Sequence, residues 1–140
     1  MLTALDTSVV IAALLSWHEW HAKAAAAVDR LMAADQILLP LPVLIESFSV
    51  MTRLPHPHRL SGGDALEVLR SFTDAATAGF PTRRIWSFLA SANAKEMIGG
   101  RVYDAVIVEC AIAGEARRLL TFNSRDFALF DERIEVVEPG

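Results

Sequence analysis

Apolar residues along the chain form two kinds of segment, and their spacing predicts an alternation of strands and helices. Short, mainly apolar runs at residues 2–5, 37–39, 118–121 and 134–137 are typical of buried strands, and a further strand is predicted at residues 84–86. Longer segments carry apolar residues every three or four positions, the period of a helix with one buried face. They predict helices at residues 9–15, 18–33, 43–53, 63–78, 87–98 and 101–113, and a loop with one helical turn at residues 123–130.

This order of elements indicates the α/β class, because short strands alternate with helices of about 10–15 residues. Parallel crossovers are right-handed, so we expect a three-layer α/β/α sandwich with helices on both faces of a mostly parallel sheet. The sequence has no internal repeat, and its most linker-like stretch is LPHPHRL at residues 54–60, which is too short to separate domains. A single domain over residues 1–140 is therefore predicted.

Composition and charge exclude several classes of protein. A chain that is 53% hydrophobic and 21% charged has enough apolar surface to fold, which excludes intrinsic disorder. The formal net charge of −4 argues against a protein that holds nucleic acid by phosphate neutralisation alone, but not against an enzyme that binds cations. The single Cys110 is expected to be a buried, reduced thiol. Apolar stretches shorter than the ~18 residues of a membrane span favour a cytoplasmic protein.

Four acidic residues are candidates for chemistry. Asp6 ends the first predicted strand, and Asp126 follows the strand that ends at Thr121. Glu46 and Asp104 lie in apolar segments that we expect to form largely buried helices, where an unpaired carboxylate is costly. Each also has a simpler interpretation. Asp6 and Asp126 can cap helical turns, Glu46 can lie on a solvent-facing stripe, and Asp104 can pair with Arg101 three positions before it.

The simpler interpretations need a separate explanation for each acid, whereas one shared site explains them together. Ligands of open parallel sheets bind beyond the carboxyl ends of the strands, where Asp6 and the residues after Thr121 are expected. Two carboxylates ~4 Å apart repel by about 4 kcal/mol at an effective dielectric near 20. A cluster of them therefore needs protons or a cation, and carboxylate oxygens suit Mg²⁺ or Mn²⁺. Such ions assist phosphodiester hydrolysis.

Four motifs that span nearly the whole chain resemble the PIN-domain family, and within it the VapC-type toxins of bacterial toxin–antitoxin pairs. The motifs are LDTSVVIAAL at residues 5–14, PVLIES at 42–47, YDAVIVECA at 103–111 and LLTFNSRDF at 119–127. The resemblance implies a Mg²⁺- or Mn²⁺-dependent endoribonuclease with an α/β/α fold. It also implies that the protein forms a homodimer and is neutralised by an antitoxin with a basic side chain near the acidic pocket.

The resemblance carries metal-ligand and catalytic roles onto Asp6, Glu46 and Asp104. The fourth position is open between Asn123 and Asp126, because the family has either Asp or Asn after the strand-end Thr. Thr7 and Thr121 are expected to orient carboxylates or water through their hydroxyl groups.

An alternative function is an interaction protein of the same fold without catalytic activity, in which the acidic pocket only binds a partner. The histidines do not support a zinc site. His18 and His21 are expected on a helix surface, and His56 and His58 in a solvated loop.

Overall fold

The computed structural model describes residues 1–130 and 132–140. Five strands form one sheet: β1 (Leu2–Leu5), β2 (Ile37–Pro40), β3 (Ala76–Ala78), β4 (Ala116–Leu120) and β5 (Glu135–Val137). Their order is β3-β2-β1-β4-β5, and every neighbouring pair is parallel. The predicted class, an α/β protein with a parallel sheet, is confirmed.

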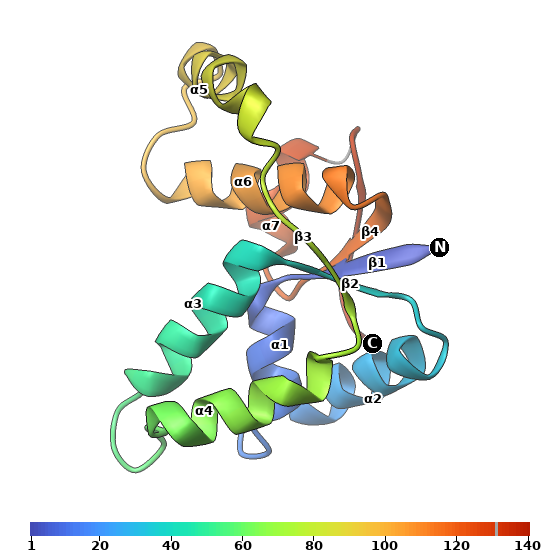
Figure 1. Ribbon diagram of the computed structural model, residues 1–140, viewed down its shortest axis with the longest axis vertical. Helices are drawn as coiled ribbons and strands as arrows, with labels where there is room; N and C mark the ends of the chain where they lie inside the picture. Colours follow the sequence, from blue (N-terminus) through green and yellow to red (C-terminus); the bar gives the residue numbers. More distant parts are fainter. Residues whose placement is uncertain (131) are drawn as a thin grey trace.

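Helices lie on both sides of this sheet (Figure 1), which gives the expected three layers. In the described residues the α-helices are α1 (Thr7–Leu14), α2 (His21–Ala33), α3 (Leu41–Thr52), α4 (Gly62–Leu69), α5 (Ile85–Ala94), α6 (Gly100–Ala113) and α7 (Ser124–Phe127). In Figure 1, α5, α6 and α7 lie above the sheet, and α1, α2 and α4 lie below it. The carboxyl ends of the strands, where β1 continues into α1 and β2 into α3, face the α3 side.

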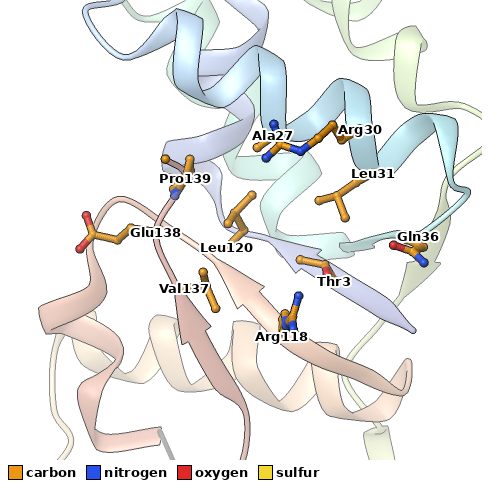
Figure 2. Close-up of a pocket in the computed structure, with 11 residues that line it drawn as sticks. Thr3, Ala27, Arg30, Leu31, Gln36, Arg118, Leu120, Val137, Glu138 and Pro139 are labelled. Atoms are coloured by element: carbon orange, nitrogen blue, oxygen red, sulfur yellow. The ribbon is translucent and has the colours of Figure 1, made fainter.

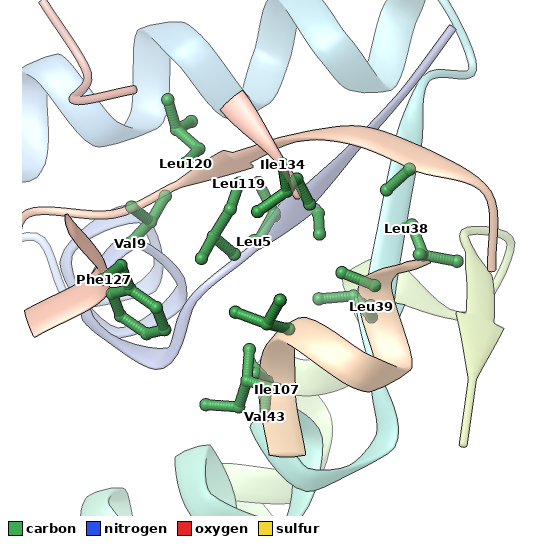
Figure 3. Packing of buried hydrophobic residues seen from close by; sticks show 14 of the residues in the cluster. Leu5, Val9, Leu38, Leu39, Val43, Ile107, Leu119, Leu120, Phe127 and Ile134 are labelled. Carbon is green, nitrogen blue, oxygen red and sulfur yellow. The ribbon is translucent and has the colours of Figure 1, made fainter. Parts of the chain in front are cut away.

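The core lies on both faces of the sheet, against α6 on one face and against α1 and α2 on the other. Figure 3 shows Leu5 and Leu119 from the central strands directed toward Ile107 of α6, with Phe127 of α7 closing one end. Leu5, Leu119 and Phe127 are at most 1% exposed. Strand β1 is covered on both faces, so Thr3, Ala4 and Leu5 are all buried without the polar alternation of a half-exposed strand. Such a rigid core fixes where the strand ends lie.

Two predicted elements are wrong, and both lie on the periphery. The helix predicted at residues 63–78 ends at Leu69, and its last part, β3, is an edge strand that pairs with β2. The helix start is as expected, because the Ser61 hydroxyl accepts a hydrogen bond from the backbone N–H of Asp64 at 3.1 Å. The strand predicted at residues 84–86 is instead the start of α5, which buries Phe88 and Ala92 four positions apart.

The lone Cys110 is fully buried on α6, as expected. Burial raises the pKa of its thiol to about 11, and the neighbouring Glu109 acts in the same direction, so the thiol stays protonated and unreactive near neutral pH. Among the described residues, no helix combines the length and the apolar character required to cross a membrane.

Candidate active site

A pocket of about 280 Å³ lies beyond the carboxyl ends of β1 and β4. Asp6, Glu46, Asp104 and Asn123 all line it, although they are spread over more than a hundred positions of the sequence. The chain leaves β1 toward β2 on one side, and β4 lies on the other, so this is the point where the strand order reverses. Ligand sites of open parallel sheets occur at such points.

Asp6 is held by hydrogen bonds from the end of β4 and from Ser8 in the first turn of α1, not by a capping bond of its own side chain. Its backbone N–H donates to the carbonyl of Leu120 at 3.0 Å, which fixes the end of β1 against β4. Its carboxylate Oδ2 accepts from the Thr121 hydroxyl at 2.7 Å and from the Ser8 hydroxyl at 3.0 Å. The carboxylate makes no capping bond to α1, so helix capping does not explain this acid.

Thr121 connects Asp6 to the loop after β4. It is fully buried, and its hydroxyl oxygen accepts a hydrogen bond from the backbone N–H of Asn123 at 2.9 Å. Ser8 completes the link, because its hydroxyl accepts from the backbone N–H of Phe122 at 3.1 Å. Ser8 was not among the candidates named from the sequence. Its role is visible only in its contacts with Thr121 and Phe122, which lie 113 and 114 positions away in the sequence.

Glu46 and Asp104 project from α3 and α6 into the same pocket. The expected burial is wrong for Glu46, which is exposed. Helix α3 turns Val43, Ser47 and Met51 toward the core, and Glu46 lies to one side of this buried face. Asp104 is half-buried. Its helix is buried mainly from Ala105 onward, so the pocket is open at the amino-terminal end of α6.

The acidic residues act on one another electrostatically. The pKa of Asp104 is raised from 3.8 to about 6, first by burial and then by the negative charges of Asp6, Asp126 and Glu46. Arg101, the partner considered for Asp104, lowers the pKa as the smallest of these influences. An ion pair with Arg101 therefore does not explain Asp104, and the four acids form one electrostatic cluster.

The two candidates for the fourth position differ in placement. Asn123 lines the pocket directly, whereas Asp126 is an exposed residue of α7 whose charge reaches Asp104. Thr7, at the first position of α1, also lines the pocket. Its hydroxyl oxygen is buried and has no hydrogen-bond partner among the residues that the structure describes.

The acids surround the pocket without already forming a closed cage. Within residues 1–130 and 132–140, no three His, Cys, Asp or Glu side chains are close enough together to hold a metal ion as they stand. Hard cations such as Mg²⁺ are commonly bound through one or two carboxylates and several waters, which an open pocket accommodates. The arrangement is thus suited to a hydrated cation with a phosphate ligand.

His18 and Trp20 also line the pocket, and sequence reasoning placed His18 wrongly. Helix α2 begins at His21, so His18 lies in the loop before it rather than on a helix surface. The His21 ring is within hydrogen-bond distance of the Ala12 carbonyl, at 2.9 Å. His56 and His58 are exposed loop residues, as expected.

A second pocket of about 390 Å³ has a different character (Figure 2). It lies between α2, which contributes Arg30, and the strands β4 and β5, which contribute Arg118 and Val137. The Arg118 Nε donates to Glu135 Oε2 at 3.0 Å, so this cation is already paired. The pocket lacks the converging carboxylates of the first, which is therefore the stronger candidate.

Comparisons with known proteins agree with the architecture. The family model of the PIN domain matches residues 3–133. The chain is 33% identical over 137 residues to ribonuclease VapC40 of Mycobacterium tuberculosis, covering 95% of this chain and 96% of that one. It is 36% identical over 124 residues to ribonuclease VapC27 of the same organism, covering 87% and 85%. The fold also matches VapBC2 of Rickettsia felis with a TM-score of 0.70, at 18% identity and over 100% of both chains.

Proposed function

The chain belongs to the PIN-domain family, and we propose that it is a metal-dependent endoribonuclease toxin neutralised by a cognate antitoxin. The observation that carries the proposal is the convergence of Asp6, Glu46, Asp104 and Asn123 on one pocket beyond the strand ends. The two relatives named ribonucleases, which align over most of the chain, support the same reaction class.

The side chains in the pocket fit a divalent cation. The candidate ligands Asp6, Glu46, Asp104 and Asn123 offer oxygen atoms, which suit Mg²⁺ or Mn²⁺, and among the described residues no Lys or Arg lines the pocket to balance the negative charge. Asp6, Glu46 and Asp104 would hold the ion, with Asn123 or Asp126 as a further ligand. The unpartnered Thr7 hydroxyl is a donor that a coordinated water or a phosphate oxygen would satisfy. When bound, the cation supplies water activation and neutralises charge on the phosphate.

The protein itself contributes orientation to this reaction. Thr121 and Ser8 donate to the same oxygen of Asp6, which fixes the plane of its carboxylate in the pocket. The backbone N–H of Asn123 donates to the Thr121 hydroxyl. The positions of Asp6 and Asn123 in the pocket therefore both depend on this one buried hydroxyl group. RNA is then held with its scissile phosphate at the acids, within an open pocket that admits water for hydrolysis.

The homodimer belongs to the proposal as well, and the exposed apolar residues beside the pocket support it. Ile45 of α3 and Tyr103 of α6 are 71% and 72% exposed, and together with Pro42 they line an apolar depression of about 400 Å³. Exposed apolar patches of this kind commonly mark protein interfaces. The antitoxin is expected to place a basic side chain near the four acids, whose charges attract it.

The deciding experiment measures cleavage of a structured RNA pool by the purified protein, freed of any partner. Reactions contain Mg²⁺, Mn²⁺ or EDTA, and compare the parent protein with Asp104→Asn. The exposed Asp29 on α2 provides a matched control, because Asp29→Asn removes the same charge away from the pocket. We expect cation-dependent cleavage that Asp104→Asn reduces at least about a thousandfold, as the loss of several kcal/mol of transition-state stabilisation requires.

Two results would contradict this function. Equal rates of cleavage by the parent and by Asp104→Asn would show that the Asp104 carboxylate takes no part in the reaction. No cleavage of any RNA by a folded parent protein that still binds a partner would favour the interaction protein without catalytic activity.

A further inference from the structure

Five aromatic rings form a continuous row along one rim of the acidic pocket. The row, which we call the aromatic rim, consists of His58, Trp17, His18, Trp20 and Phe122. Neighbouring ring centroids are 4.0, 6.0, 5.8 and 4.7 Å apart in this order. The rings come from three loops: those between α1 and α2, between α3 and α4, and after β4.

Two rings of the aromatic rim line the pocket itself. His18 and Trp20 line the pocket together with the acids, and Phe122 directly precedes Asn123. The backbone N–H of Trp20 donates to the His18 ring nitrogen Nδ1 at 3.1 Å, which orients the His18 ring. The rim is therefore continuous with the candidate active site.

Packing alone does not account for the two tryptophans. Trp17 and Trp20 are 47% and 41% exposed, and each has its ring stacked on a single aromatic partner. Both tryptophans lie outside the two clusters of core residues. Large exposed aromatic rings grouped beside a site are typical of a binding surface.

We propose that the aromatic rim binds unpaired bases of the RNA substrate, with one base stacked on Trp20 next to the scissile phosphate. This inference rests on the proposed ribonuclease function. Proteins recognise RNA mainly through single-stranded loops, whose unstacked bases stack on aromatic side chains. A chain with net charge −4 gains little affinity from overall phosphate neutralisation, so base stacking is expected to contribute much of its affinity for RNA.

The position of the rim favours RNA over a protein partner. An RNA whose phosphate reaches the acids must run its adjoining nucleotides over the pocket edge, and the rim forms part of that edge. The loop that carries His58 also presents the exposed Arg53 and Arg59. Both are cations that phosphates of a strand continuing past His58 could contact. The substrate class implied is RNA with at least one unpaired nucleotide beside the cleaved bond.

The test compares three variants in binding and in catalysis. Trp20→Leu keeps an apolar side chain over Phe122 but removes the ring, whereas Trp20→Phe keeps a ring. Trp86→Ala is the matched control, because Trp86 on α5 is 79% exposed and does not line the pocket. Binding of fluorescein-labelled RNA, single-stranded or fully duplex, is measured by anisotropy with Mg²⁺ in the Asp104→Asn background. KM and kcat for the single-stranded RNA are measured with the same Trp20 and Trp86 variants in protein that retains Asp104.

We expect Trp20→Leu to weaken binding of single-stranded RNA about 5- to 150-fold, the range for loss of one stacked base. KM should rise by a similar factor with little change in kcat, Trp20→Phe should restore most of the loss, and Trp86→Ala should match the parent. Duplex RNA should bind weakly to every variant.

Unchanged binding and KM in Trp20→Leu would overturn the proposal and leave the rim as a surface for a protein partner. An equal loss in Trp20→Leu and Trp20→Phe would also overturn it, because stacking would not be the cause. The two proposals fail separately. Ring-dependent binding of single-stranded RNA without any cleavage contradicts the ribonuclease, whereas cation-dependent cleavage that is insensitive to Trp20 contradicts only the aromatic rim.

Discussion

Helix α6 carries two carboxylates only five positions apart whose surroundings are opposite. Glu109 is 4% exposed and bound by two guanidinium groups, from Arg133 at 2.6 Å and Arg84 at 3.3 Å. Asp104 is half-buried among other acids, and the pKa of its carboxyl is raised to about 6. At Glu109 the protein neutralises a buried charge with its own residues, whereas at Asp104 it leaves like charges together.

The difference separates a structural cluster from a functional one. Glu109 joins α6 to the segment before α5 and to the segment before β5, so its ion pairs connect three parts of the chain. The acids at the pocket repel one another and weaken the folded state unless a cation or protons are present. Proteins commonly retain such unfavourable arrangements at functional sites.

The largest changes in stability are expected when each of the two carboxylates is neutralised in turn. The two substitutions should move stability in opposite directions. Glu109→Gln should lower the free energy of unfolding by about 2–3 kcal/mol, somewhat less than for a fully buried pair, since both arginines are partly exposed. Asp104→Asn should raise the melting temperature of the metal-free protein by relieving repulsion. Urea unfolding and thermal melting in EDTA measure both.

The exposed pair Glu67–Arg70 provides the control for these two variants. Its atoms are 3.7 Å apart, and the Glu67 side chain is 78% exposed, so Glu67→Gln should change stability little. If Glu109→Gln and Asp104→Asn changed stability in the same direction, the distinction between a structural cluster at Glu109 and a functional one at Asp104 would be wrong.

A smaller effect is expected from the hydroxyl that orients Asp6. Thr121→Val keeps the shape of this buried residue but removes the hydrogen bond to Asp6. The Mg²⁺ concentration for half-maximal cleavage should rise about tenfold, the lower end for such orienting residues. Thr121→Ser retains a hydroxyl and should behave like the parent. Equal Mg²⁺ dependence in Thr121→Val and the parent would show that Asp6 needs no orientation from β4.

The smallest effect concerns pH. The pKa of Asp104 is 3.8 in the unfolded reference and about 6 in the folded protein, so the folded state binds its proton more tightly. Protonation of Asp104 therefore stabilises the folded state. This stabilisation is complete below pH 3.8 and is lost as the pH rises through about 6. In EDTA, the parent should therefore lose more stability between pH 5 and pH 7 than Asp104→Asn does. Identical pH profiles from thermal melting would contradict the raised pKa.

Much of the fold could be predicted from the sequence, because local pattern dominates in the core. Buried strands such as β1 are mainly apolar, with Thr3 as the single polar residue of β1, and α6 is recognisable from its apolar spacing. The errors at β3 and at the start of α5 occur in exposed segments. Ala76–Ala78 has no strong strand propensity and becomes a strand because β2 offers an unpaired edge.

The sequence by itself determined which residues are chemically unusual: Asp6 at a strand end, and Glu46 and Asp104 within apolar helices. It did so because burial makes a carboxylate costly wherever it occurs along the chain. Only the tertiary structure decided which charges meet. Asp104 faces three acids and Glu109 faces two arginines because α6 packs differently on its two sides. Likewise, the segments after β1 and β4 converge at the strand ends and bring together Ser8, Thr121 and the aromatic rim. These residues are far apart in the sequence, so no local sequence pattern predicts their contacts.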